Sequence, residues 1–301
     1  FSTLLSLFLN SFKRGSAQEK SLASSAIGLL ALTAGYCDDN RELQDSLTPM
    51  LKALDPGSPP SLVKNVLDSL AIIAFVGEEY TEDTKTVMDR IWQLIVHKPS
   101  SNVQVKKLSP DVIASAISAW SFILTTMGGE ILDFNHWKEL VSGFSSLLER
   151  TDPSIRMASG EALAALFEIA ASRYFPDDVV EGLKGKMLDQ MSTLSDIERG
   201  DTHAEKKNLN QLIKLFSDIE NFLVDGESPR TSTMVGKERL VTDSWASYIQ
   251  LKFLKNVLDG GFENHMQRMD RYLAEKTRSQ YLKQNRKGAQ MERDSILLES
   301  G

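Results

Sequence analysis

The residues with the clearest chemical potential are the basic side chains near the carboxyl end of the chain. Residues 266–293 contain eight lysine and arginine residues and three acidic ones, a net charge of +5. Lysine and arginine neutralise the phosphates of a nucleic-acid backbone, and Tyr272 and Tyr281 offer rings on which unstacked bases can lie. The composition therefore indicates phosphate contact, although a solvated helix or a disordered end would have the same composition.

A helical wheel of this segment distributes polar residues over almost the whole circumference. Lys276, Lys283 and Lys287 share one stripe, whereas Arg278 and Arg286 lie well off it. A helix that is polar nearly all round has no face with which to pack on its own core. A membrane-surface helix would need an apolar face that this wheel lacks. We therefore expect a helix that requires a polar partner, or a segment without fixed structure.

The sequence contains none of the motifs of catalysis or metal binding that we searched for. Glycine-rich phosphate loops, the nucleophile elbow and the paired histidines of zinc hydrolases do not occur. The four histidines are scattered, with no two at helical spacing: His97, His136, His203 and His265. The single cysteine, Cys37, precedes two aspartates, whose charges disfavour the reactive thiolate. We predict no enzymatic activity, no metal site and no cofactor.

The charge of the whole chain hides this basic segment. The 301 residues include 34 lysines and arginines against 41 aspartates and glutamates, a net charge of −7. Because residues 266–293 carry +5, the remainder carries −12. Such an acidic body argues against a protein that coats nucleic acid along its whole length. The hydrophobic content of 42% is too high for a wholly disordered chain.

Four segments with helical periodicity share one pattern: a polar start, small residues at helical spacing, then large aliphatic residues and a small-residue close. They are Ser16–Gly35, Pro60–Gly77, Ser109–Gly128 and Thr151–Ala170. Their starts lie about 42 to 49 residues apart, in the range of armadillo and HEAT units. Alanines at helical spacing would let a neighbouring helix approach closely. These are Ala23, Ala26, Ala71, Ala116, Ala162 and Ala165.

We therefore predict an all-α fold in which residues 1–190 form an armadillo- or HEAT-like solenoid of stacked helical hairpins. A non-repeating helical bundle is the alternative. Asp152 is the expected N-cap of the last repeat helix, with Pro153 in its first turn. The apolar run Val112–Gly129 predicts a buried helix, because a membrane span needs about 20 mostly apolar residues. Since Phe1 is followed by what resembles a helix interior, we expect the chain to begin within a longer protein.

The pattern changes after Met191. A polar stretch, Ser195–Asn208, precedes an amphipathic helix over Leu209–Val224 and a loop over Asp225–Gly236. We find no strand alternation or hairpin pattern in the chain. These features predict a small helical subdomain over residues 191–265.

One more helix is expected within this subdomain. Thr242 or Asp243 is its predicted N-cap, and Gly260 with Gly261 is predicted to end it. Residues 266–301 then form the predicted basic tail helix.

A motif in the last repeat resembles the interferon-related developmental regulator family. The motif is Val or Ile, then Arg-x-Ala-x-Gly-Glu, and later Leu-Phe-Glu, which this chain carries over Ile155–Glu168. Further similar segments bring the resemblance to about Leu148–Arg286, while the first half is similar only as generic helical repeats. They are Leu194–Asp196, Lys206–Lys207, Gly236–Leu240, Asp243–Trp245, Leu258–Phe262, His265–Met266 and Thr277–Arg286.

The resemblance implies an armadillo-like scaffold without enzymatic activity. Members of the family are described as transcriptional co-regulators, and also as factors that occupy translationally inactive ribosomes. In the second setting a carboxyl-terminal helix enters the space used by mRNA and tRNA. A helix polar on all sides suits a channel walled by rRNA, so this setting also accounts for the basic tail.

We therefore expect a ribosome-binding factor with rRNA and ribosomal proteins as partners, acting in the cytoplasm. The alternative is a protein-protein scaffold that acts in the nucleus with co-repressor proteins. Neither role involves a membrane or a small-molecule substrate. The expected RNA-binding residues are Arg268, Arg271, Lys276, Arg278, Tyr281, Lys283, Arg286, Lys287 and Arg293. The expected further ribosome contacts are Lys206, Lys207, Lys237 and Arg239.

Overall fold

The structure is a computed structural model in which most of the chain is helical. It describes residues 1–34, 41–76, 82–96, 108–127, 132–173, 175–200 and 206–267. The first helices are α1 (Ser2–Arg14), α2 (Ala17–Ala34), α3 (Arg41–Lys52), α4 (Pro60–Val76), α5 (Glu82–Ile95) and α6 (Pro110–Thr126). Then come α7 (Phe134–Leu148), α8 (Pro153–Ala171), α9 (Asp177–Gly200), α10 (Lys206–Asp225), the strands β1 (Thr231–Val235) and β2 (Glu238–Thr242), and α11 (Trp245–Leu258).

The chain divides into two compact units. The first contains Phe1–Thr231 and Val241–Val257, and therefore all of α1 to α10 and nearly all of α11. The second contains Ser232–Leu240 and Leu258–Gly301, of which the hairpin and a short helical segment up to Gln267 are described. The domain boundaries that the sequence predicts near residues 190 and 265 stay predictions.

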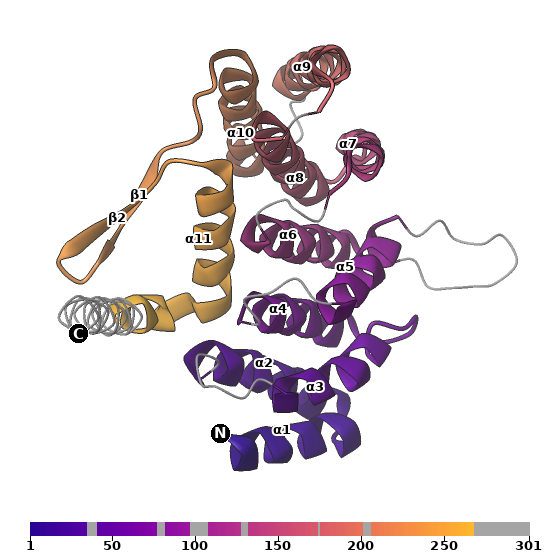
Figure 1. The fold of residues 1–301 in the computed structure, drawn as a ribbon, viewed down its shortest axis with the longest axis vertical. Helices are drawn as coiled ribbons and strands as arrows, with labels where there is room; N and C mark the ends of the chain where they lie inside the picture. The colour runs from indigo at the N-terminus through magenta and orange to yellow at the C-terminus, as the bar shows by residue number, and fades with distance from the viewer. Residues whose placement is uncertain are drawn as a thin grey trace, which may run out of the picture. The chain divides into compact units, whose positions relative to one another are not determined.

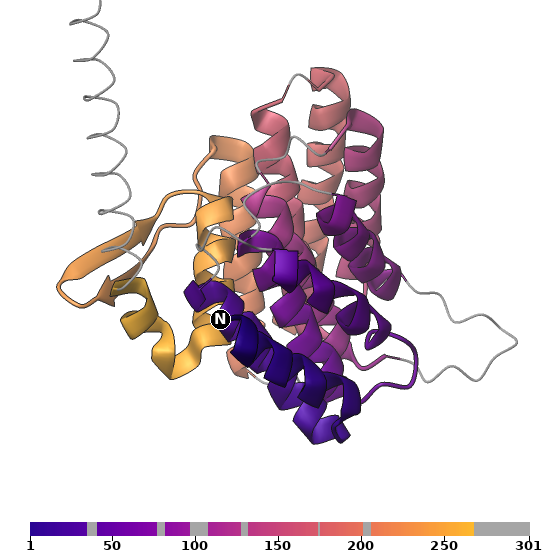
Figure 2. The ribbon, with the colours of Figure 1, turned by 60° about the horizontal axis from the view of Figure 1, so that its bottom comes forward.

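The predicted helical repeat is confirmed in the first unit. The helices α2, α4, α6 and α8 stack on one another as an inner layer, and α3, α5 and α7 form an outer layer beside them (Figure 1). The predicted repeat segments coincide with the four inner helices, within one or two residues at most ends. Figure 2 shows the stacked helices of the first unit from a second direction.

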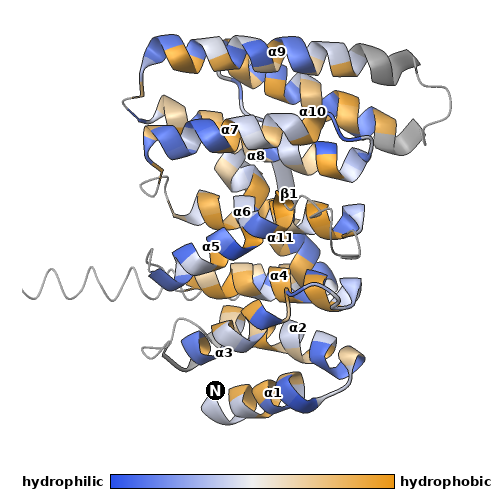
Figure 3. Cartoon of the chain, turned by 90° about the vertical axis from the view of Figure 1, so that its right-hand side faces the viewer, coloured by the Kyte–Doolittle hydropathy of each residue, from blue (hydrophilic) through white to orange (hydrophobic). Residues whose placement is uncertain are grey.

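The two layers differ in hydropathy because they differ in how many neighbours they have. An inner helix is covered on several sides and is therefore apolar around most of its circumference, whereas an outer helix keeps a solvated face. In α6, Ala116, Trp120 and Ile123 are fully buried. Figure 3 shows α4 and α6 mostly in the hydrophobic colour, while α5 and α7 carry hydrophilic residues. None of the described helices has the length and hydropathy needed to cross a membrane.

An aromatic cluster joins the two layers at the centre of the first unit. The cluster contains Trp92 of α5, Trp120 of α6 and Phe144 of α7, whose ring centroids lie 5.2 to 5.9 Å from one another. Nearby, Trp137 of α7 donates a hydrogen bond from Nε1 to the carbonyl of Leu166 in α8, at 2.8 Å. A buried indole needs such a partner for its N–H, so this bond sets the register of α7 on α8.

The predicted start of α8 is confirmed at the level of single atoms. The Oδ1 atom of Asp152 accepts hydrogen bonds from the backbone N–H groups of Ser154, at 2.9 Å, and Ile155, at 3.3 Å. Pro153 occupies the first helical position, where no N–H partner is needed.

Two predictions about the carboxyl-terminal region are wrong. Residues 231–242 form a two-stranded hairpin, where part of a loop was predicted and no strand was expected. The N-cap of α11 is Ser244, whose Oγ accepts a hydrogen bond from the N–H of Ser247 at 3.1 Å. Thr242 cannot serve that purpose because its hydroxyl already bonds across the hairpin to Thr231.

The two ends of the polar stretch predicted over residues 195–208 belong to helices. The helix α9 continues to Gly200 and α10 begins at Lys206. The amphipathic helix predicted over Leu209–Val224 is confirmed as the main part of α10. Asp259–Gly261 forms a single 3-10 turn after α11, at the position where two glycines were predicted to end the helix.

Candidate functional site

The structure places the predicted RNA-binding residues in three different situations. The tail residues from Arg268 to Arg293 lie outside the described part of the chain, so their role stays a prediction. The backbone of Lys206 and Lys207 forms the first turn of α10. Lys237 and Arg239 are exposed on the hairpin.

The turn of the hairpin lies in the second unit and is fixed by contacts of Gly236. Gly236 has a φ of +63°, in the left-handed region that favours glycine, and its N–H donates to Oε1 of Glu263 at 3.0 Å. A Cβ atom at this position would also lie 2.7 Å from Nε2 of Gln267. These constraints hold the turn between the strands and present Lys237 to solvent.

A second arrangement of polar groups anchors α11 on α8. Both carboxylate oxygens of Glu168 accept hydrogen bonds at the start of α11, from the N–H groups of Trp245 at 2.7 Å and Ala246 at 2.8 Å. The first N–H groups of a helix have no partner within it, and their dipoles favour a negative charge. Glu168 therefore satisfies and stabilises the amino terminus of α11.

Two turns earlier on α8, Glu161 holds α11 a second time. Its carboxylate is buried and forms an ion pair with Lys252, which lies two turns into α11. Burial and the charges of Glu161 and Asp218 raise the pKa of Tyr248. The seven-residue spacing between Glu161 and Glu168 thus matches the spacing between Trp245 and Lys252.

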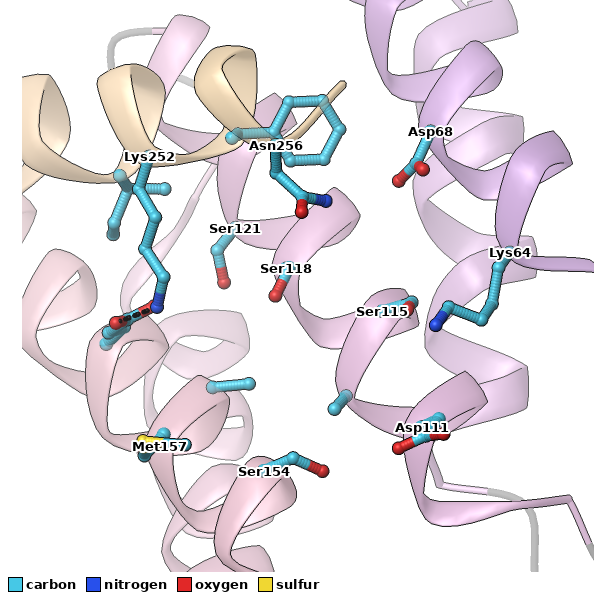
Figure 4. Close-up of a pocket in the computed structure, with 15 residues that line it drawn as sticks. Lys64, Asp68, Asp111, Ser115, Ser118, Ser121, Ser154, Met157, Lys252 and Asn256 are labelled. Carbon is cyan, nitrogen blue, oxygen red and sulfur yellow. Dashed lines mark hydrogen bonds and ion pairs between the residues drawn. The ribbon is translucent and has the colours of Figure 1, made fainter. Parts of the chain in front are cut away.

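Beside this anchored helix lies a groove of about 390 Å³. Its floor is α6, and α4, α8 and α11 supply its walls (Figure 4). A row of serines on α6, at intervals of three residues, faces the groove: Ser115, Ser118 and Ser121. Figure 4 shows the hydroxyls of Ser118 and Ser121 directed into the space beside Lys252.

The polar groups of the groove are incompletely paired. Ser121 is 2% exposed, and its Oγ has no hydrogen-bond partner among the described residues. Asp68 and Lys64 project from α4 into the same space (Figure 4). Burial raises the pKa of Asp68 to about 6, and the nearby ammonium of Lys64 only partly opposes this shift. A buried polar group without a partner is costly, so these residues indicate a site that can accept further hydrogen bonds.

Comparison with known proteins agrees with the resemblance found in the sequence. The family model for interferon-related developmental regulator matches residues 1–224. The chain belongs to the interferon-related developmental regulator family. It is 24% identical over 271 residues to interferon-related developmental regulator 2 of Mus musculus, covering 88% of this chain and 60% of that protein. It is 25% identical over 268 residues to interferon-related developmental regulator 1 of Homo sapiens, covering 85% and 57%.

The chain thus spans about three-fifths of the length of these relatives. The match to the interferon-related developmental regulator family begins at residue 1, well before Leu148, where the recognisable motifs begin. The first repeats are therefore part of the family domain, although their sequence resembles generic helical repeats.

The structure explains the motif of this family in α8 as a packing junction. A Cβ atom on Gly160 would lie 3.1 Å from Cδ1 of Ile219, so glycine permits the close approach of α10. Arg156 donates from Nε to the carbonyl of Arg150 across the α7–α8 turn, and burial lowers the pKa of its guanidinium. Glu161 and Glu168 of the same motif bind α11, so four motif residues on α8 hold neighbouring segments in place.

The described residues of this family member hold no candidate metal site. They contain no cluster of three or more histidine, cysteine or acidic side chains able to hold a metal ion. Of the two described histidines, His136 is exposed and donates its backbone N–H to the N-cap Asp133 at 2.9 Å. His97, His203 and Cys37 lie outside the described residues.

The groove was not predicted from the sequence. The serines at 115, 118 and 121 were visible, but they interrupt an apolar run that predicts burial. Their three-residue spacing places them on one side of a helix and was the available indication of a polar face. Neither Asp68 nor Lys252 could be connected to this face, because only the tertiary fold brings α4 and α11 beside α6.

Proposed function

We propose that this chain is a non-enzymatic ribosome-binding factor that occupies translationally inactive ribosomes. In this proposal the helical body docks on the ribosome, and the basic segment after residue 265 enters the path of mRNA and tRNA. The supporting observation is the segregation of charge: residues 266–293 carry +5 and the rest of the chain carries −12. The names of the relatives describe developmental regulators. The proposed ribosomal role rests on the family resemblance and on this charge pattern.

The acidic body and the basic segment have different tasks in this function. A body of net negative charge is repelled by exposed rRNA, so it does not coat RNA indiscriminately. The basic segment concentrates attraction into a length of chain that a narrow channel can accept. Lys237 and Arg239, exposed on the hairpin, add further cations for phosphate contact.

The test is cosedimentation of the purified chain with vacant ribosomes over a range of salt concentrations. Each phosphate contact on a single strand contributes about 0.7 to the slope of log affinity against log salt. If six basic side chains of the tail contact phosphates, replacing all six with glutamine should make this negative slope shallower by about 4. These are Arg271, Lys276, Arg278, Lys283, Arg286 and Lys287.

A matched control replaces Lys184 and Lys186 of α9 with glutamine, since these lysines lie in the described body, away from the tail in sequence. This variant should keep the slope of the unaltered chain. Ribosome binding and a salt slope that both survive removal of residues 266–301 would exclude the tail's role.

The second candidate function is a protein-protein scaffold in transcriptional co-regulation. The groove on the inner layer favours it, because a polar groove beside a stack of helical repeats offers a surface for a protein segment. Partners that are recovered after nuclease treatment, and that do not require the tail, would favour this function over ribosome binding.

A further inference from the structure

The inner layer already holds one polypeptide segment, the helix α11. The ring of Phe253 stacks on Phe122 of α6, with centroids 4.2 Å apart and an interplanar angle of 19°. Nε2 of Gln250 donates to the carbonyl of Thr125, at the end of α6, at 3.1 Å. The face of α6 is therefore suited to a segment that offers an apolar side chain and a hydrogen-bonding group.

The groove continues this face toward α4, where no segment covers it among the described residues. A serine hydroxyl is both a donor and an acceptor, and a peptide main chain presents both kinds of group. Asn256 of α11 adds an amide with the same double capacity at the opposite wall. The buried and unpaired hydroxyl of Ser121, directed into the groove, provides a specific point of attachment.

The charges of the groove favour a cationic ligand. Lys252 is neutralised by its ion pair with Glu161. The remaining charged groups are Asp68 and Lys64 on α4 and Asp111 in the first turn of α6. Two carboxylates against one ammonium leave a net negative charge, and half-buried Asp68 has no hydrogen-bond donor among the described residues. A lysine or arginine side chain would supply both the charge and the donors.

We propose that this groove binds an extended segment of a partner protein. The main chain of the segment bonds to Ser118, Ser121 and Asn256, and one of its lysine or arginine side chains lies against Asp68 and Asp111. The volume of about 390 Å³ is in the range of ligand sites. This inference does not depend on ribosome binding, because it concerns the helical body and the other proposal concerns the tail.

Three labelled peptide mixtures would test the site by fluorescence anisotropy with the full chain. Each mixture contains acetylated and amidated nine-residue peptides with lysine, norleucine or glutamate fixed at the centre, and with alanine, serine, leucine and asparagine mixed elsewhere. We expect the lysine mixture to bind about tenfold more tightly than the norleucine mixture, as for a hydrogen bond to a charged group. The glutamate mixture should bind more weakly than both.

Two variants locate the binding. Asp68→Asn should remove most of the preference for lysine over norleucine, and Ser121→Ala should weaken the lysine mixture about threefold to fivefold, as for one neutral hydrogen bond. The matched controls are Asp89→Asn, on the exposed surface of α5, and Ser159→Ala, which removes another buried unpaired hydroxyl that does not line the groove. Both controls should bind the lysine mixture like the unaltered chain.

Three results would overturn the proposal. The first is that no mixture binds, in which case the groove holds water alone. The second is that lysine, norleucine and glutamate mixtures bind equally. The third is that binding is unchanged by both groove variants, which would place the binding site elsewhere.

A second variant keeps the test valid if Asp68→Asn unfolds the chain, which a thermal melt would reveal. Asp111→Asn then tests the same preference for lysine from an exposed position. A chain that lacks residues 266–301 should bind the mixtures like the unaltered chain. This result would separate the groove proposal from the proposal of ribosome binding, which requires the tail.

Discussion

Serines line two parts of the inner layer, and their hydroxyls have different environments in the two parts. Between α2 and α4, the hydroxyl of Ser69 donates to the carbonyl of Ser24 at 2.8 Å, and Nδ2 of Asn65 donates to Oγ of Ser21 at 2.8 Å. On α6, Ser121 is equally buried but has no partner among the described residues. The first set joins two helices, whereas the second faces a groove.

The distance between neighbouring helices produces this difference. A Cβ atom on Gly28 of α2 would lie 2.9 Å from Oγ of Ser69, so the two helices are close enough for direct hydrogen bonds. Beside α6, the groove separates α4 from α11. Small polar residues therefore stabilise the stack where helices touch, and become available to a ligand where they do not.

The largest expected effect on stability comes from placing a side chain in the close contact between α2 and α4. In Gly28→Leu the new side chain meets the backbone and hydroxyl of Ser69, so the free energy of unfolding should fall by about 3 kcal/mol. The matched change in the groove, Ser118→Leu, should alter it by less than about 1 kcal/mol because space is available. Urea unfolding measures both, and equal losses would contradict the assignment of an open groove.

The next effect is an increase in the free energy of unfolding, and it concerns Asp68. Its pKa is about 6 in the folded chain and near the ordinary value of 3.8 in the unfolded chain, so folding favours the protonated acid. The contribution of Asp68 to stability should therefore be most favourable below about pH 4 and should be lost as the pH rises through about 6. Asp68→Asn should remove this dependence and raise the free energy of unfolding at pH 7 by about 2 to 3 kcal/mol.

Urea unfolding between pH 4 and pH 8 would measure this difference. Asp89→Asn, at an exposed position of α5, serves as the control and should leave the pH dependence of the unaltered chain in place. A parallel pH dependence in Asp68→Asn and the unaltered chain would show that another group is responsible.

The smallest expected effect is seen by comparing Ser69, which bonds between two helices, with Ser121, which faces the groove. Ser69→Ala removes hydrogen bonds between α2 and α4 and should lower the free energy of unfolding by about 1 to 2 kcal/mol. Ser121→Ala removes a buried hydroxyl without a partner, so it should leave the free energy of unfolding unchanged or raise it by up to about 1 kcal/mol. The comparison fails if Ser121→Ala is as destabilising as Ser69→Ala.

The hairpin shows why part of the fold escaped prediction. Its strands are short and half exposed, so apolar alternation is weak. The available indication was the presence of threonine and valine on both sides of Gly236, since β-branched residues favour strands and glycine favours a tight turn. Thr242 has a side chain suited to cap α11, but its hydroxyl bonds across the hairpin, and that bond exists only because Thr231 lies opposite it.

The sequence by itself determined the helical repeat, the cap at Asp152, the family motif and the separation of basic from acidic residues. These features depend on residue type and on spacing within a few turns of helix, which periodicity reports directly. Only the tertiary structure decided that Glu161 and Glu168 hold α11, and that Asp68, Ser121 and Asn256 line one groove. Such contacts join residues far apart in the chain, and they exist only once the packing of helices has set their distances.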